Sequence, residues 1–568
     1  MPHQNLTSQR ANRCFSVISL AVLLMSVSIS TGCSSLWPGK SGDSESDAGL
    51  KDLMKMPDPP DLVREAAVAR GLQSIQVDGI AVVNGLPGTG GPANPSGYRD
   101  QLLEEMKRNK VTDPNHFLEL DSTAMVRVRA LIPPGARRGD PLDLLVLAPT
   151  SSNVKDLHNG WLLDTRLRHQ QRIQSSVRQS EVMAIGMGAV LTRADFEPGA
   201  DDSLKNEGVI LSGGRVQQTR ELGLILRPEY QNVWMSRDLA NAVNRRFFFF
   251  DGTTRRGIAK AIEDDFIQVE VHPRYRHNEQ RLMAVIRAIA VEEESSRTQQ
   301  RLSKLASRLR EPATAADAAL QLEALGESAV PTLLEGLESS DPELRFYAAE
   351  ALAYLDRVEA IDPLEQAATN VAAFRQPALT ALHGIPQQLA VDALNRLTRQ
   401  ESLETRYAAF VALRRRDDGR RFLSGTTLGE AFKVYQVPTS AKPAIVVALR
   451  DQPEIVLFGD IAPVSIPDFL FGTGGIVVKP DPVQTGDLRV TRFQPNKDDQ
   501  LASVPSTVQG LLEGVVMVGG GYGDAIAILR ECKDKGYLSD QLAIDPLPTS
   551  QRTYFREDGE DDDSGDAL

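Results

Sequence analysis

The sequence predicts a multidomain protein in which an α+β body of two β-rich segments is interrupted by an all-α solenoid. Its 568 residues exceed what one hydrophobic core normally holds. Strand-like alternation runs through residues 66–295 and returns in residues 426–548. Between them, residues 296–425 are rich in Glu, Arg, Ala and Leu with a helical period. We therefore expect two separate stretches of chain to build the α+β body.

The chain begins with the features of a secretory signal peptide. Arg10 and Arg13 precede an apolar run, Cys14–Ile29, which small residues separate from Cys33. A charged start, a short apolar segment and small residues before a cut site are typical of secretory signals. A membrane span needs about 20 apolar residues, more than this Ser-containing run offers. We expect residues 1–32 to be a removable signal.

Ser30-Thr31-Gly32-Cys33 resembles the lipobox of bacterial lipoproteins, although Ser30 stands where that motif has Leu or a similar apolar residue. The resemblance implies lipidation of Cys33. The alternative is an ordinary signal cut that leaves Cys33 as a thiol. Two acyl chains, at roughly 0.8 kcal/mol per buried CH₂, suffice for stable anchoring. Ser34, in place of Asp, implies the outer membrane as the site of the anchor.

Two further segments have compositions that do not support a packed core. Residues 33–65 are rich in Ser, Gly, Asp and Pro, and we expect a flexible tether. Residues 549–568 contain the acidic run EDGEDDDSGDAL from Glu557, and we expect a disordered tail.

Composition narrows the function classes. The net charge of −13 argues against non-specific nucleic-acid binding, and aromatic residues make up only 5% of the chain, which disfavours a base-stacking surface. Of the three cysteines, Cys14 leaves with the signal and Cys33 is the lipidation candidate. Cys532 is then alone, so we expect no disulfide.

Residues 66–295 predict a mixed α+β segment. The expected strands are Ala124–Leu131, Leu142–Leu147 and Phe266–Val271. The expected helices are Gly97–Lys110, Ser236–Phe247, Arg255–Asp265 and Glu279–Ala290.

Residues 296–425 contain an internal repeat of 30 or 31 residues. Arg345, Ala348, Ala351 and Leu352 return as Arg375, Ala378, Ala381 and Leu382, and again as Arg406, Ala409, Ala412 and Leu413. A period in this range indicates stacked helix pairs that bury their apolar faces against one another. The pattern resembles short HEAT-type repeats, with the arginine expected near a turn. Such arrays often bind a partner protein on one face.

Residues 426–548 predict strands followed by helices. The expected strands are Ala444–Leu449, Glu454–Phe458 and Gly475–Val478, followed by a loop over residues 479–500. The expected helices are Thr507–Val518 and Gly523–Lys535.

The β-rich segments resemble the flagellar basal-body P-ring protein family. The stretch Val77–Gly90 (VDGIAVVNGLPGTG) is similar to the family's opening signature. Similar stretches follow in order: Ala124–Pro134, Asp156–Leu163, Glu181–Val190, Asn206–Glu221, Asp238–Asn244 and Ile267–Val269. Beyond the repeats, the stretches that resemble the family's ending are Ser503-Val504, Thr507–Val518, Asp524–Leu529, Lys535-Gly536 and Leu542–Ile544. Family members typically lack both a lipid and a repeat array.

No catalytic, cofactor-binding or metal-binding residue is predicted. Gly85–Gly91 lacks the spacing and the Lys-Ser/Thr of a phosphate-binding loop, so we interpret it as a tight turn. His272 and His277 are expected in a surface loop. The run Phe247–Phe250 is either a helix end entering a buried turn or a subunit interface, where aromatic residues are enriched.

The resemblance implies a structural subunit and not an enzyme. The expected function is a closed ring of identical subunits around the flagellar rod, in the periplasm, with rod and L-ring proteins as neighbours. The repeats are expected to dock an unidentified protein, and the lipid to hold the ring on a membrane. The alternative is a lipid-anchored envelope scaffold whose repeats bind a protein partner.

Overall fold

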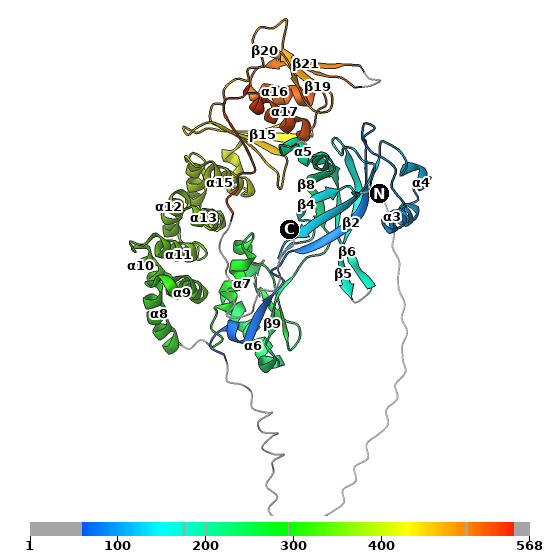
Figure 1. Ribbon diagram of the computed structural model, residues 1–568. Coiled ribbons are helices and arrows are strands. Elements are labelled where there is room, and N and C mark those ends of the chain that lie inside the picture. Colours follow the sequence, from blue (N-terminus) through cyan, green and yellow to red (C-terminus); the bar gives the residue numbers. More distant parts are fainter. Residues whose placement is uncertain are drawn as a thin grey trace, which may run out of the picture. The chain divides into compact units, whose positions relative to one another are not determined.

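A computed structural model of the chain describes residues 60–150, 152–173, 176–199, 201–292, 295–494 and 498–549 (Figure 1). The expected signal peptide, the lipidation candidate Cys33, nearly all of the tether and residues 550–568 of the tail lie outside these residues. Among the described residues, no helix combines the length and the apolar character needed to cross a bilayer.

The first β-rich segment contains an antiparallel sheet that closes on itself. Its strands are β2 (Ile75–Asn84), β3 (Ala124–Ile132), β4 (Pro141–Leu147), β5 (Trp161–Ile173), β6 (Ser176–Ala189) and β8 (Glu207–Val216). The order is β4-β3-β2-β5-β6-β8, and β8 pairs again with β4. Short β7 (Leu191–Thr192) pairs with β8 in antiparallel orientation. Alternate residues of these strands, such as Val126, Val128 and Leu144, form one buried cluster.

Helices cover part of the outer surface of this closed sheet. Helix α3 (Gly97–Arg108) begins at Ser96, whose hydroxyl accepts a hydrogen bond from the Arg99 N–H at 3.2 Å. Its buried Leu102, Leu103 and Met106 form a cluster with Ile80, Val82 and Met125 of β2 and β3. The short α4 (Pro114–Phe117) follows. The alternation predicted for Ala124–Leu131 is confirmed, with apolar residues on both faces because α3 covers Met125.

A second antiparallel sheet follows in the same segment. Its order is β1 (Ala67–Arg70), β9 (Leu222–Leu226), β13 (Phe266–Val269) and β12 (Ala259–Ala261). Its buried side chains form one cluster with those of α6 (Val233–Arg246) and α7 (Glu279–Arg287). The remaining short elements are α2 (Val63–Ala66), α5 (Arg193–Phe196), η1 (Asp202–Lys205), η2 (Pro228–Tyr230), η3 (Pro273–Tyr275) and the hairpin β10 (Phe248–Asp251) with β11 (Thr254–Gly257).

The helix predicted over Arg255–Asp265 is wrong. These residues form β11 and β12 and then the turn into β13. The side chain of Asn244 in α6 binds the backbone of β12, the edge strand of this sheet. Its amide donates to the Ala259 carbonyl and accepts from the Ala259 N–H, both at 2.8 Å. This pair of bonds satisfies Ala259 as a neighbouring strand would. A Cβ on Gly257 would lie 2.1 Å from Asn244 Oδ1, so glycine permits the approach.

Residues 295–415 form eight consecutive helices. They are α8 (Ser295–Leu309), α9 (Pro312–Leu325), α10 (Val330–Leu337), α11 (Pro342–Ala353), α12 (Ile361–Asn370), α13 (Ala372–Gly384), α14 (Gln388–Leu397) and α15 (Leu403–Arg415). Short turns of 3-10 helix, η4 (Gly326–Ala329) and η5 (Val358–Ala360), lie between pairs, and η6 (Arg420–Phe422) follows α15. The alanine and leucine positions of the predicted repeat are buried.

The repeated arginines of the array bind backbone carbonyls or a neighbouring carboxylate. Arg345 Nη1 donates to the Ser339 carbonyl at 2.6 Å, and Arg375 Nη1 lies 2.5 Å from Glu404 Oε2. Arg406 Nη1 donates at 3.0 Å to the carbonyl of Lys442, beyond the array. Each arginine therefore fixes a turn or a neighbouring segment.

The last segment contains a mixed sheet and two helices. The sheet order is β14 (Ser424–Leu428), β15 (Phe432–Val437), β17 (Glu454–Phe458), β16 (Ala444–Val447) and β22 (Gln541–Ile544). Tyr407 and Phe410 of α15 pack on one face of this sheet, against Tyr435 and Phe458. Residues of the opposite face cluster with α16 (Val508–Met517) and α17 (Tyr522–Asp534).

A four-stranded antiparallel sheet completes this segment. Its order is β18 (Leu470–Phe471), β19 (Ile476–Pro480), β20 (Asp487–Arg492) and β21 (Gln500–Pro505). The loop predicted over residues 479–500 is therefore wrong in part, because it contains β20. Leu191 and Phe196, from the first segment, lie in the same buried cluster as the residues of α16 and α17.

Candidate assembly site

The four-stranded sheet β18–β21 carries a row of apolar residues on its outer face. Phe471 pairs with Val477, Val477 with Thr491, and Thr491 with Leu501, so these positions stand side by side across all four strands. The β20 position, Thr491, is polar and buried, so the exposed apolar residues lie on either side of it. Phe471 is 61% exposed and Leu501 58%. Phe469 and Phe493, which flank the row in sequence, are 52% and 51% exposed. We call Phe469, Phe471, Phe493 and Leu501 the apolar row.

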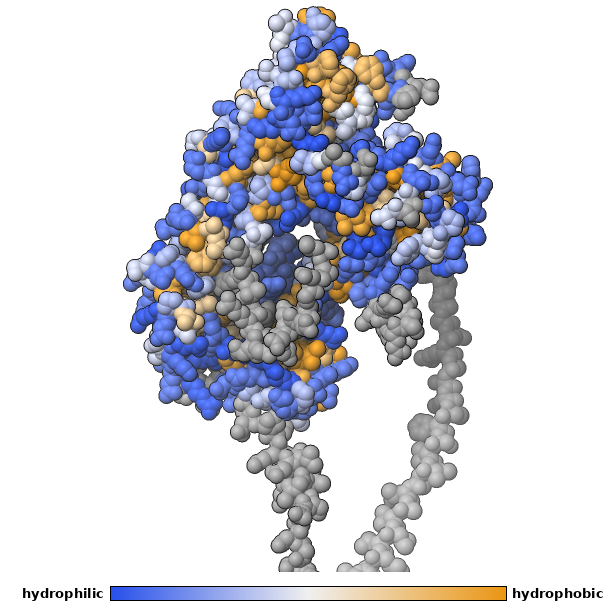
Figure 2. Space-filling view, in the orientation of Figure 1, coloured by the Kyte–Doolittle hydropathy of each residue, from blue (hydrophilic) through white to orange (hydrophobic). Residues whose placement is uncertain are grey.

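The opposite face of the same sheet is fully packed. Leu470, Val478, Val490 and Val504 are buried with residues of α16 and α17. Figure 2 shows hydrophobic residues at the surface of the upper end of the view, over the strands labelled β19 and β21 in Figure 1. Exposed apolar side chains gathered on one face mark sites of protein or membrane contact. Among the described residues, β18 pairs with β19 alone and β21 with β20 alone, so these two strands form the edges of the sheet.

A buried histidine joins the first and last segments. His158 lies in the turn before β5, and its Nδ1 is 2.9 Å from Asp195 Oδ1 in α5. Its Nε2 forms a hydrogen bond of 2.9 Å with Asp524 Oδ1, 366 residues away at the start of α17. The Thr473 hydroxyl donates to the same Asp524 oxygen at 2.7 Å. We call His158, Asp195 and Asp524 the histidine junction.

The two carboxylates hold His158 in its charged form. Burial alone lowers the pKa of an imidazole, but the hydrogen bonds and negative charges of Asp195 and Asp524 raise the pKa of His158 to about 10. For Asp524, burial raises the pKa, but His158 and Thr473 outweigh this and lower the pKa to about 2. At neutral pH both ring nitrogens are protonated, so His158 has no free lone pair to act as a base.

Backbone bonds reinforce the histidine junction. Arg530 Nη1 in α17 donates to the Ala194 carbonyl at 2.6 Å and to the Glu197 carbonyl at 3.0 Å. A Cβ on Gly523 would lie 2.9 Å from Asp195 Oδ2, so α17 approaches α5 closely at this glycine. The chemistry of the junction is that of a structural clamp.

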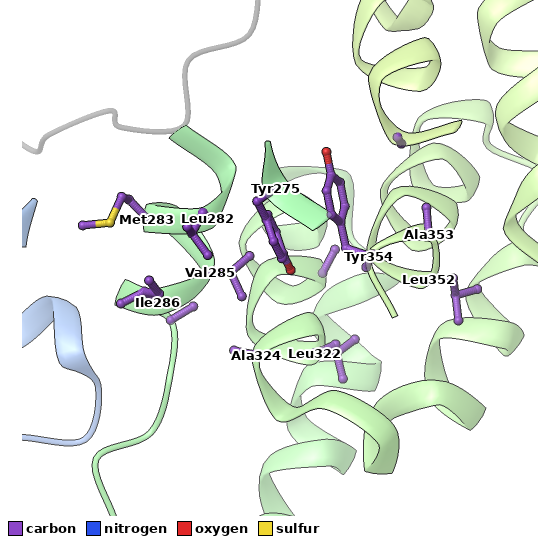
Figure 3. Packing of buried hydrophobic residues seen from close by; sticks show 14 of the residues in the cluster. Tyr275, Leu282, Met283, Val285, Ile286, Leu322, Ala324, Leu352, Ala353 and Tyr354 are labelled. Carbon is purple, nitrogen blue, oxygen red and sulfur yellow. The ribbon is translucent and has the colours of Figure 1, made fainter. Parts of the chain in front are cut away.

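A second buried cluster joins α7 to the first repeat helices. The guanidinium of Arg281 lies 2.5 Å from Glu323 Oε2 in α9 and 2.5 Å from Glu350 Oε2 in α11. Tyr275 donates to Glu323 Oε1 at 2.5 Å, and its ring stacks on Tyr354 at 4.6 Å. Figure 3 shows these two rings between α7 and the repeat helices. All five side chains are buried, and we call them the arginine cluster.

The last repeat helix is also fixed to the body. Arg415 Nη2 of α15 lies 2.6 Å from Asp451 Oδ2, and Arg414 Nη2 lies 3.1 Å from the same oxygen. The Asp451 N–H donates at 3.1 Å to Asp143 Oδ2 in β4 of the closed sheet. Asp143 Oδ1 accepts from the Ser212 N–H at 2.7 Å. Asp451, a residue of the last segment, thus links β4 of the first segment to the C-terminal end of the helical array.

The aromatic run lies where α6 ends. Phe247 is buried against Tyr275, as the buried-turn interpretation expects. Phe250 is 66% exposed on β10, so the interface interpretation stays a prediction for that residue. Gly85 and Gly88 have φ of 76° and 80°, and the turn predicted there is present.

The two histidines of the predicted surface loop differ from each other. His277 is exposed and lies 5.7 Å from the His383 ring. His272 is half-buried against Phe247 and accepts from the Arg274 N–H, so its surface placement is wrong. Burial lowers the pKa of His272 to about 4. The described residues contain no group of His, Cys, Asp and Glu arranged to hold a metal ion.

Comparison with known proteins confirms the resemblance for the first segment and the repeats. Residues 63–300 match the family model of the flagellar P-ring protein, and residues 300–382 match that of HEAT repeats. Among relatives, the flagellar P-ring protein of Yersinia pseudotuberculosis serotype O:3 (strain YPIII) is 26% identical over 256 residues, 43% of this chain and 64% of the relative.

Two further relatives carry the same name. The flagellar P-ring protein of Thermotoga maritima is 26% identical over 241 residues, covering 40% of this chain and 66% of the relative. The flagellar P-ring protein of Bordetella avium (strain 197N) is 28% identical over 193 residues, covering 33% of this chain and 50% of the relative. The chain thus spans less than two thirds of the length of these relatives.

Proposed function

We propose that this chain is a structural subunit of the flagellar basal-body P ring and assembles as a closed ring around the rod in the periplasm. The observation that carries the proposal is the match of residues 63–300 to the P-ring family model. A ring of identical subunits needs a surface that meets a different surface of the next copy. Such a subunit requires rigidity and contact area, and no catalytic group.

The proposal includes a single P-ring-type body that the repeats interrupt, with residues 66–295 and 426–548 as its two parts and residues 296–425 as the insert. The histidine junction supports this organisation because it pairs His158 and Asp195 of the first part with Asp524 of the second at 2.9 Å. The shared cluster of Leu191 and Phe196 with α16 and α17 supports it too. Two independent domains would not need a common core.

The apolar row is the surface we assign to subunit contact. Phe469, Phe471, Phe493 and Leu501 are each more than half exposed in the single chain, and aromatic side chains are enriched at subunit interfaces. The open edges of β18 and β21 add unpaired backbone groups beside the row. Rod and L-ring proteins would be the outer neighbours of the ring. Lipidation of Cys33 would hold the ring on the outer membrane.

Electron microscopy of purified basal bodies tests the proposal. Antibody against this chain is expected to label the ring position in cells with the native sequence. In cells with Phe471→Asp and Leu501→Asp, the chain is expected to fold, with native circular dichroism, and the ring to be missing. The matched control is Leu389→Asp, because Leu389 is similarly exposed at 56% but lies in the array.

Two results would contradict the proposal. Absence of label at the ring position would favour the lipid-anchored scaffold. Rings that form normally with both aspartates in place would remove the apolar row as the contact surface. Labelling with a radioactive fatty acid, with Cys33→Ala as control, tests the anchor separately.

A further inference from the structure

A cleft of about 1130 Å³ lies where the first segment, the end of the array and the start of the last segment meet. Six arginines and one lysine line it, against four carboxylates. The whole chain carries a net charge of −13, so this surplus of positive charge is local. A groove lined by one sign of charge attracts ligands of the opposite sign.

Several of these cations face solvent. Lys433 is exposed on β15, and no ion pair to it occurs within the described parts of the chain. Arg276 is 53% exposed and lies 3.5 Å from Asp140, and Arg420 is 63% exposed and lies 3.3 Å from Asp417. Exposed pairs of this kind contribute little and exchange partners readily. The cleft therefore offers charge for a flexible acidic ligand.

The end of the described chain is close to this cleft. Leu547 and Pro548 line an adjoining cavity of about 280 Å³. The two cavities share His277, His383, Arg414, Arg415 and Asp451. The sequence after Thr549 reaches the run Glu557–Asp566, which has seven carboxylates and no basic residue. Seven residues lie between Thr549 and Glu557, so the eight residue steps from one to the other can span at most about 28 Å.

We propose that the acidic segment Glu557–Asp566 binds in this basic cleft of its own chain. The opposite charges, the position of Pro548 and the length of the intervening chain all support this occupant. A tail bound there would compete with any other acidic ligand for the same arginines. The inference does not depend on ring assembly.

Cross-linking of the full chain with a carbodiimide, which joins an amine to a carboxylate without a spacer, tests the proposal. Lys433 is the one lysine of the cleft lining. Its cross-link to the tail is expected to exceed, several-fold, that of Lys479, which is exposed on β19 outside the cleft. The yield should fall between about 50 mM and about 500 mM salt, because screening weakens contacts between exposed charges.

A charge reversal that leaves the reacting groups intact provides the control. Arg276→Glu with Arg420→Glu is expected to reduce the Lys433 cross-link several-fold, whereas Arg108→Glu, a similarly exposed arginine on α3, should not. Equal cross-linking of Lys433 and Lys479, or no effect of the double reversal in a natively folded chain, would overturn the proposal. Cross-links between isotopically heavy and light chains would place the tail in a neighbouring copy and would also overturn it.

Discussion

Replacement of His158 by Gln tests how strongly the histidine junction holds the two segments together. The side chain is 11% exposed and lies between Asp195 and Asp524, which are 2% and 0% exposed. Gln has no charge, so the variant leaves two buried carboxylates without their cation. Breaking a buried ion pair by removing one partner costs about 3–5 kcal/mol.

The effect should depend on pH in a defined direction. The pKa of His158 rises from 6.5 to about 10 on folding, so its contribution is complete below pH 6.5 and disappears as the pH passes 10. At 1.36 kcal/mol per pKa unit, linkage gives about 5 kcal/mol at pH 6, about 3 at pH 8 and below about 1 at pH 10. On the acid side, Asp524 loses its contribution as the pH falls from 3.8 to about 2.

Urea unfolding of the native chain and the His158→Gln variant at pH 6, 8 and 10 measures this difference. The matched control is His116→Gln, because His116 is exposed in the short helix α4. We expect the free energy of unfolding of the control to follow that of the native chain at each pH. A difference below about 1 kcal/mol at pH 6, or one that grows with pH, would refute the assignment of His158 as a charged clamp.

Two further predictions concern buried charges. Arg281→Met should lower the free energy of unfolding by about 3–5 kcal/mol, because Glu323 and Glu350 lose their cation. Adding Glu323→Gln and Glu350→Gln should restore most of that free energy. Urea titration measures both variants, and no recovery in the triple variant would contradict the electrostatic explanation. Burial raises the pKa of Glu454 from 4.5 to about 7, so ionising it costs stability as the pH rises through this range. Between pH 4.5 and pH 8.5, the free energy of unfolding of the Glu454→Gln variant should therefore rise by about 3 kcal/mol relative to that of the native chain. Thermal unfolding measures this, and a stability difference between the two proteins that does not change with pH would exclude the Glu454 carboxyl as the cause.

Local patterns predicted much of the fold. The 30-residue repeat identified the helix pairs because each pair buries its apolar face on its neighbour, so the signal lies within a short window. A helix was wrongly predicted over Arg255–Asp265 because Ile258 and Ile262 have helical spacing. The hydrogen bonds that hold this segment as a strand come from Asn244 in α6, which is distant from it in the local pattern. Strand β20 was missed because it lies within a stretch rich in Asp, Gln and Pro, whereas its partners β19 and β21 flank that stretch.

The sites were harder to predict than the elements. His158 lies in the stretch that resembles the P-ring family, but nothing near it in sequence indicates that Asp524 will bind it. The same is true of Arg281, whose partners lie 42 and 69 residues away in the repeats. Residues of the apolar row alternate with buried ones, as in any half-buried strand. Only the packing of α16 and α17 on one face identifies the other face as open.

The attachment of the helical array at both ends has a mechanical consequence. A solenoid held at one end behaves as a spring, and its repeats can open one after another from the free end. Here the arginine cluster fixes α9 and α11 to α7, and Arg415 with Asp451 fixes α15 toward β4. An array restrained in this way acts as a strut. We expect its helices to lose hydrogen-exchange protection together with the body, as one cooperative unit.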